Sequence, residues 1–184
     1  MIISFVMPDE TMGKKILEAT LGVYCWTVSS YEENQYLDLY KVLEEWEEGS
    51  ATNTFQEGSV SWNVRQGSDS WLTPGGTHCD LPQDRFLIPS ASHYPEFDIT
   101  ELVQEWVNGT SPNYGVIIKN DTPVSTGIKA SEYSEYGRPY LEITYTNACP
   151  DFDGDGDVDG TDLALFAADY NENCLGMFAD AFGF

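Results

Sequence analysis

Basic side chains are scarce in this sequence. The 184 residues include 8 lysines and arginines against 31 aspartates and glutamates, which gives a formal net charge of −23. Recognition of nucleic-acid phosphates needs clustered Lys and Arg, and so does docking on anionic lipid, so the composition argues against both kinds of partner. Long apolar runs are lacking too. No stretch of about 18 apolar residues occurs, so we expect no membrane-spanning segment.

Catalytic motifs are also missing. The chain has two histidines, His78 and His93, without an HExxH pattern, and it has no GxSxG, GxGxxG or P-loop sequence. Carboxylate pairs for glycoside hydrolysis are spatial pairs, and 31 acidic residues make their mere presence uninformative. We therefore predict that the chain is not an enzyme.

The sequence has no CxxC pair, which argues against zinc and redox sites. Four cysteines allow three disulfide pairings, and spacing alone does not choose among them. Bridges are typical of exported proteins, and we favour them over free buried thiols. The candidates are Cys25, Cys79, Cys149 and Cys174.

Apolar residues make up 41% of the chain and aromatic residues 14%, which is enough for a packed core. Short apolar runs separated by Gly, Pro, Asn and Ser indicate strands. In residues 140–146, Leu141, Ile143 and Tyr145 alternate with polar residues. We predict a mainly β fold, an antiparallel β-sandwich, with irregular excursions over residues 47–95. The predicted strands cover residues 2–6, 16–24, 36–42, 114–119 and 140–146.

One helix is expected within this β pattern. The stretch from Asp98 to Glu101 matches a capping box, which satisfies free N–H groups at a helix start. Leu102, Val103 and Trp106 then share one face, as in an amphipathic helix. The Asn-Gly pair at residues 108–109 is a stop signal.

Acidic residues are concentrated near the end of the sequence. Residues 149–184 hold nine acidic groups and no Lys or Arg. In the twelve residues 151–162, oxygen-bearing side chains fall at loop positions 1, 3, 5, 7, 9 and 12, with Gly156 at position 6. Calcium prefers about six to eight oxygen ligands, which a twelve-residue loop can supply. The alternative is a solvated acidic linker. The predicted Ca²⁺ ligands are Asp151, Asp153, Asp155, Asp157, Asp159 and Asp162.

The predicted ligands have different roles. Asp157 contributes its backbone carbonyl, Asp159 ligates directly or through water, and Asp162 supplies a final, bidentate carboxylate. Leu163, Phe166, Ala167 and Tyr170 follow at helical spacing and predict a short amphipathic helix.

This composition shift predicts a domain boundary, with one domain at residues 1–147 and a calcium-binding loop-helix segment at residues 148–184. Cys149 and Cys174 bracket the loop and helix, and a bridge between them would hold this small unit closed.

Several segments together resemble the DNRLRE domain, a disaggregatase-related repeat grouped with carbohydrate-binding modules of family 96. The resemblance covers nearly all of residues 1–146 in family order. The matching segments are KILEATL (15–21), LYKV (39–42), EWEEG (45–49), VSWN (60–63), WLTPGG (71–76), FDITELVQEWVNG (97–109), NYGVIIK (113–119), SE (131–132) and RPYLEITY (138–145).

The resemblance implies a jelly-roll β-sandwich that serves as an accessory module in exported or surface proteins, with polysaccharide as partner. It implies a secreted or cell-surface location in a bacterium or archaeon. Domains of this family begin with further strands before the segment that matches residues 2–6, so we expect N-terminal strands to be missing here.

A second resemblance concerns the acidic segment. DFDGDG (151–156) and VDGTDLAL (158–165) are similar to one half of a type I dockerin. A full dockerin carries two such halves and binds a cohesin. Only one acidic residue, Asp180, lies between residues 175 and 184, so the second half is absent. We expect an isolated calcium-stabilised segment rather than docking to a cohesin-like partner.

Aromatic rings that stack on sugars are the expected glycan contacts. Trp106 is predicted to lie in the core, and Trp46, Trp62 and Trp71 to anchor loops. The better candidates for a sugar platform are Tyr133 and Tyr136, in the predicted loop of residues 132–137.

The negative net charge of the chain limits which glycans it can bind. A polyanionic glycan would be repelled unless calcium bridged it, so we expect a neutral glycan. Two alternatives stay open: a structural or adhesive spacer without glycan binding, and a fragment of a polysaccharide-degrading enzyme.

Overall fold

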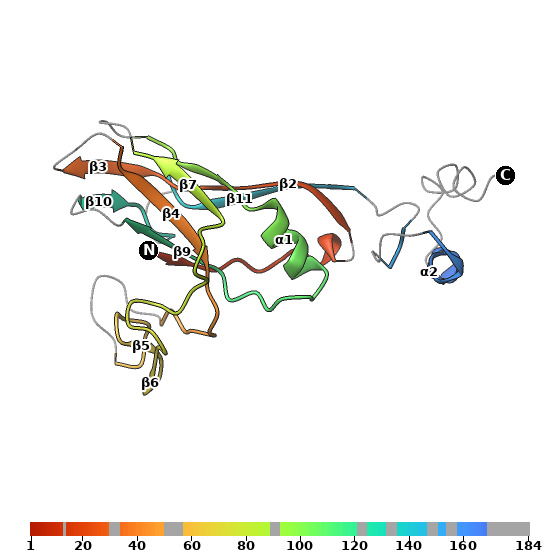
Figure 1. Cartoon of the computed structure of the whole chain (residues 1–184), viewed down its shortest axis with the longest axis horizontal. Helices are drawn as coiled ribbons and strands as arrows, with labels where there is room; N and C mark the ends of the chain where they lie inside the picture. Colours follow the sequence, from red (N-terminus) through yellow and green to blue (C-terminus); the bar gives the residue numbers. More distant parts are fainter. Residues whose placement is uncertain are drawn as a thin grey trace. The chain divides into compact units, whose positions relative to one another are not determined.

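The structure is a computed structural model that describes residues 1–12, 14–29, 34–49, 57–88, 93–120, 125–131, 136–146, 151–153 and 158–168. These residues form a mainly β structure with antiparallel sheets and two short α-helices (Figure 1), which confirms the predicted β class and antiparallel pairing. Within these ranges, neither helix is long and apolar enough to cross a membrane.

The strands are β1 (Ile2–Ile3), β2 (Lys15–Gly22), β3 (Cys25–Ser29), β4 (Tyr36–Lys41), β5 (Val64–Gln66), β6 (Asp69–Ser70), β7 (Asp84–Leu87), β8 (Glu96–Asp98), β9 (Val116–Asn120), β10 (Ser125–Ile128) and β11 (Tyr140–Thr146). The helices are α1 (Thr100–Val107) and α2 (Gly160–Ala168), and a 3-10 turn, η1, covers Asp9–Thr11.

The chain forms two compact units whose segments interleave along the sequence. Unit 1 comprises Met1–Phe5, Thr20–Ile99 and Asn113–Glu142, and unit 2 comprises Val6–Ala19, Thr100–Pro112 and Ile143–Phe184. The predicted boundary at residues 147–148 lies outside the described residues, so it stays a prediction.

A four-stranded sheet of order β1-β9-β4-β7 is the centre of unit 1. Every adjacent pair in it is antiparallel, with Leu39 opposite Ile118 on one side of β4 and Asp84 on the other. Leu39 and Ile118 are both buried, and Val42, Trp71 and Ile117 pack together as a further part of the core. The remaining strands form the sheets β11-β2-β8, β10-β3 and β5-β6.

A polar pair is built into this sheet. Asp38 on β4 is only 1% exposed, and it lies directly opposite Arg85 on β7. The guanidinium donates from Nε to Oδ1 at 3.0 Å and from Nη2 to Oδ2 at 3.0 Å. The same guanidinium lies over the Tyr36 ring, 4.7 Å from its centroid. The two hydrogen bonds and the positive charge of Arg85 therefore offset the cost of removing the Asp38 carboxylate from water.

Helix α1 in unit 2 confirms the predicted buried face and C-terminal stop. Its start differs from the predicted capping box, because the N–H of Asp98 donates to Oδ2 of Asp84 at 2.8 Å. Leu102, Val103, Trp106 and Val107 are its buried residues. The helix ends where the Asn-Gly pair predicted, in a Schellman arrangement around Gly109, whose φ is 67°. The Gly109 N–H donates to the carbonyl of residue 106, and the N–H of residue 110 donates to that of residue 105.

Most predicted strands are present with small shifts of their ends. The first is shorter than expected, because β1 covers only Ile2–Ile3. In the predicted irregular stretch, residues 57–83 hold only the short strands β5 and β6, and β7 follows at Asp84.

Candidate functional site

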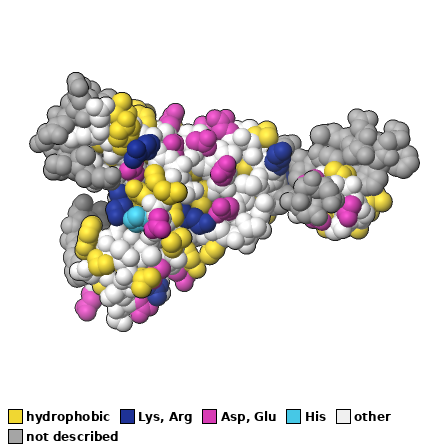
Figure 2. Space-filling model, viewed as in Figure 1, with side chains coloured by type: hydrophobic (Ala, Val, Ile, Leu, Met, Phe, Trp, Pro, Cys, Tyr) yellow, Lys and Arg dark blue, Asp and Glu magenta, His cyan; other side chains and the backbone are white. Residues whose placement is uncertain are grey.

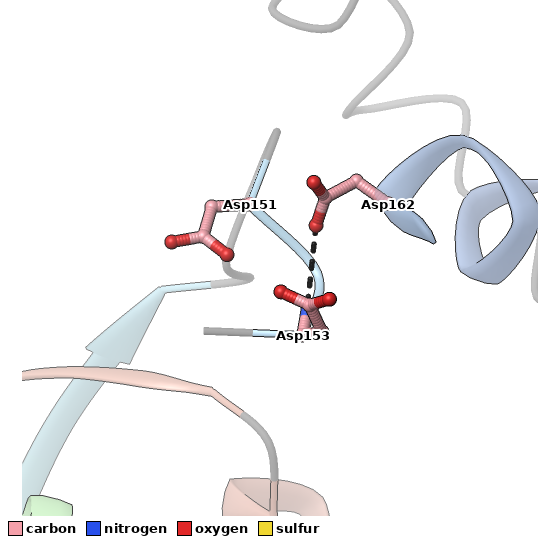
Figure 3. Close-up of side chains that lie close together, drawn as sticks. All are labelled: Asp151, Asp153 and Asp162. Carbon is pink, nitrogen blue, oxygen red and sulfur yellow. Dashed lines mark hydrogen bonds between the residues drawn. The ribbon is translucent and has the colours of Figure 1, made fainter. Parts of the chain in front are cut away.

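Three of the predicted calcium ligands come together in unit 2. One carboxylate oxygen from each of Asp151, Asp153 and Asp162 lies within 4.8 Å of those of the other two (Figure 3). Asp151 and Asp153 belong to the start of the acidic segment, while Asp162 lies in the first turn of α2. Carboxylates about ten positions apart in the sequence are thus neighbours in the structure.

Asp162 organises this arrangement. It is fully buried, and its Oδ1 accepts the N–H groups of Phe152 at 2.5 Å and Asp153 at 3.2 Å. Its Oδ2 accepts the N–H of Asp159 at 2.7 Å. Burial by itself raises the pKa of Asp162, but these backbone N–H groups outweigh it and lower the pKa below the usual aspartate value. The buried carboxylate is therefore held in its charged form.

Asp159, predicted to ligate directly or through water, caps helix α2. Its Oδ1 accepts the N–H of Thr161 at 2.6 Å, and its carbonyl accepts the N–H of Leu163 at 3.2 Å. Asp159 is thus the N-cap of α2, and its carboxylate is not part of the three-carboxylate cluster. The predicted ligands Asp155 and Asp157 lie outside the described residues.

The chemistry of the cluster fits a hard divalent cation. All of its candidate donors are carboxylate oxygens, which Ca²⁺ prefers. Residues 149–184 contain no Lys or Arg, so no side-chain cation of this segment neutralises the three charges. The Asp162 carboxylate is buried and already accepts several backbone N–H groups, whereas Asp151 is half-buried and Asp153 exposed, so the latter two are the more accessible candidate ligands.

The helix after the loop forms as predicted, but its buried face differs. Phe166 is buried and its ring centroid lies 5.6 Å from that of Phe152. Leu163 is 48% exposed, and Ala167 is exposed as well, so the predicted stripe of apolar residues is wrong at both, while Tyr170 lies outside the described residues. The helix packs through Asp162 and Phe166 instead, because Asp162 must face the loop that supplies its N–H donors.

The disulfide candidates divide into two groups. Cys149 and Cys174 lie outside the described residues. Cys25 and Cys79 are free thiols, so the structure forms no bridge between these two. Cys25 is fully buried on β3, and this burial raises its pKa to about 12. The Cys79 thiol donates to the carbonyl of Leu81 at 3.0 Å.

Of the two tyrosines predicted as a sugar platform, Tyr133 lies outside the described residues, and Tyr136 is 82% exposed. The Lys129 ammonium donates to the Tyr136 carbonyl at 3.2 Å and lies over the Tyr24 ring at 4.5 Å. The Tyr24 and Tyr94 ring centroids are 4.5 Å apart. Aromatic rings therefore gather near Tyr136 within unit 1.

The tryptophans separate into packed and exposed ones. Trp106 is buried, as predicted. The indole of Trp46 donates to the carbonyl of Tyr114 at 2.8 Å, and that of Trp71 to the carbonyl of Ser61 at 3.0 Å, so both anchor loops as predicted.

Trp62 is the exception. It was expected to anchor a loop, but its side chain is 68% exposed. The sequence around it resembles that around Trp71, and only the glycine pair at residues 75–76 could have signalled a close approach of a ring to the backbone.

Charged side chains of both signs lie on the surface of the described residues. Figure 2 shows Asp and Glu side chains scattered over the visible face, with few Lys and Arg, in keeping with the composition.

A scan against protein-family models gives no match for this chain, and a search of curated proteins gives none either.

Proposed function

We propose that this chain is a non-catalytic carbohydrate-binding accessory module of a secreted or cell-surface protein, with a calcium-binding segment after it. The antiparallel sheets support a sandwich of the jelly-roll type that the DNRLRE resemblance implies. The acidic segment corresponds to a half dockerin that stabilises itself with calcium.

The observation that carries the calcium part is the convergence of Asp151, Asp153 and Asp162, with Asp162 buried and ionised. Like charges this close repel one another. A divalent cation bound by the three carboxylates would remove that repulsion. Binding would therefore order the segment.

Isothermal titration of the metal-free chain with CaCl₂ tests this part. We expect one site per chain, weaker binding of Mg²⁺, and loss of the heat in the variant Asp151→Ala/Asp153→Ala. Asp80→Ala, which removes an exposed aspartate from unit 1, is the matched control and should leave the titration unchanged. Absence of heat from the unsubstituted chain would reject calcium binding.

The observation that carries the glycan part is the exposure of aromatic rings to solvent. Tyr136 and Trp62 keep most of their surface open, at 82% and 68%. Aromatic rings bury well against the apolar faces of sugars while their polar edges stay hydrated. A net charge of −23 disfavours polyanionic glycans, so the proposed ligand is neutral.

Native affinity electrophoresis tests the glycan part, with gels containing starch, hydroxyethyl cellulose, xylan or galactomannan. We expect at least one neutral polymer to retard the chain, and alginate with a chelator not to. If none of these polymers retards it, the module is a spacer. Release of reducing sugar from the same polymers would instead identify an enzyme fragment.

A further inference from the structure

A pocket of about 410 Å³ opens in unit 1, between β9 and the loop of residues 60–76. This volume lies in the lower part of the range of about 300 to 1,000 Å³ that small-ligand sites occupy. Val60 and Ile117 supply apolar lining, and Ser61 and Lys119 supply polar lining. No Asp or Glu is among the described residues that line it, although the chain carries 31 acidic residues.

The exposed Trp62 forms one wall of this pocket. A Cβ placed on Gly75 would lie 2.7 Å from the Trp62 ring, so the indole rests directly against the Gly75 backbone. Gly75 has a φ of 88°, a conformation that side chains strongly disfavour. The contact with Gly75 supports part of the ring, while the rest of its surface faces solvent.

Hydrogen bonds fix the backbone that carries this ring. The Gly75 N–H donates to the Trp62 carbonyl at 2.6 Å, and the Ser61 N–H donates to the Val64 carbonyl at 2.7 Å. Trp71, next to the pocket, is held by its own bond to the Ser61 carbonyl. Since the loop is fixed on both sides of Trp62, little conformational entropy is lost when a ligand stacks on the ring.

A hydrogen-bond donor is also oriented in this pocket. His78 Nδ1 lies 2.7 Å from the Cys79 carbonyl, so Nδ1 carries the proton and Nε2 accepts. The Lys119 ammonium, 3.0 Å from this Nε2, donates one proton there. An ammonium has three protons, so Lys119 keeps donors for a further acceptor such as a sugar hydroxyl.

We propose that this pocket binds one pyranose ring of a neutral glycan, stacked on Trp62 with its hydroxyls bonded to Ser61 and Lys119. The proposal rests on the glycan-binding function above and assigns the sugar contact to Trp62 rather than to Tyr136. A neutral ring fits because the pocket contains a stacking surface for its apolar face and hydrogen-bond donors for its hydroxyls. Met1, which carries the N-terminal amino group, lines the pocket together with Lys119. A uronate polymer would be disfavoured by the net charge of −23 that the chain carries.

Titration of intrinsic tryptophan fluorescence with neutral hexasaccharides of glucose, xylose and mannose tests the proposal. We expect one of these probes to shift the emission, and Trp62→Ala to weaken its binding by about tenfold or more. Trp62→Phe keeps a ring and should bind within a few-fold of the unsubstituted chain. Trp26→Ala removes another exposed tryptophan, which does not line the pocket, and this variant should bind normally.

An amide NMR titration of the unsubstituted chain gives a readout that does not depend on the variants folding. We expect the largest shifts at the Trp62 indole N–H and at the amides of Ser61 and Gly75. The pocket assignment is overturned if the chain binds a probe while Trp62→Ala binds as well, or if the shifts cluster at Tyr136. It is also overturned if tetragalacturonate binds more tightly than every neutral probe. If no probe binds at all, the glycan-binding function itself fails.

Discussion

The chain buries two aspartates within its described part, and the two units compensate them in different ways. In unit 1, Asp38 is paired with the guanidinium of Arg85, a full positive charge on the neighbouring strand. In unit 2, Asp162 is held by three backbone N–H groups that carry only partial charges. In the first arrangement, a full positive charge balances the negative charge of Asp38. The second places the charge of Asp162 beside the carboxylates of Asp151 and Asp153, and the proposed calcium site rests on this arrangement.

Breaking the Asp38–Arg85 pair should have the largest effect on global stability. Arg85→Ala leaves Asp38 buried without its cation. Removing one partner of a buried pair costs about 3 to 5 kcal/mol, and we expect a value near 2 to 3 kcal/mol because Arg85 itself is half exposed. Urea denaturation measures the change. Asp69→Ala, which breaks the exposed pair with Arg65, is the control and should cost less than about 1 kcal/mol.

Changing Asp162 should act mainly on the acidic segment. Asp162→Asn keeps the size of the side chain, but its amide NH₂ cannot accept the N–H groups of both loop ends. We expect calcium affinity to fall by more than the tenfold to about hundredfold typical of outer-shell partners. Titration calorimetry measures this loss. Unchanged affinity would mean that Asp162 is neither a ligand nor an organiser of the loop.

Acid should loosen the Asp162 region before any cation is added. The folded pKa of this group is lowered, so its contribution is fully present above the usual aspartate pKa of about 3.9 and is lost as pH falls through the lower folded value. Amide exchange at Phe152 and Asp159, followed from pH 6 downwards without metal, should accelerate below about pH 4. In Asp162→Asn, this acceleration should disappear.

The smallest effect is expected at the cap of α2. Asp159→Ala removes the acceptor of the Thr161 N–H and should destabilise the helix by about 1 kcal/mol. Asp159→Ser keeps a capping oxygen and should restore most of this stability. Amide exchange along Gly160–Ala168 measures both. Calcium binding distinguishes a cap from a ligand. If Asp159→Ala abolishes calcium binding, and Asp159→Ser restores helix protection but not calcium binding, then Asp159 is a calcium ligand.

Features that depend on local sequence could be predicted well. The face and the C-terminal stop of α1 follow from the spacing of Leu102, Val103 and Trp106 and from the glycine at position 109, which act within a few residues. The strand at residues 140–146 is equally local. Of the predicted oxygen-bearing positions in the acidic segment, the structure brings together 151, 153 and 162.

Features that depend on packing between distant segments could not be predicted. Trp62 and Trp71 have similar sequence surroundings, yet one is exposed and the other buried, because the difference arises from the backbone at Gly75 and the sheet residue Ile117. The exposed position of Leu163 likewise follows from Asp162 turning toward the N–H groups of Phe152 and Asp153. Helical periodicity by itself predicts that every residue of an apolar stripe is buried, so it could not predict the exposure of Leu163.

The contact between Trp62 and Gly75 has a consequence for comparative sequence work. Any side chain at position 75 would meet the indole and would also have to adopt a φ of 88°. Residues 62 and 75 should therefore change together among relatives of this chain. Where an aromatic residue is retained at 62, we expect glycine at 75, and where 75 carries a side chain, the pocket should have been lost. A two-position signature of this kind would let divergent copies be sorted into sugar binders and non-binders from sequence alone.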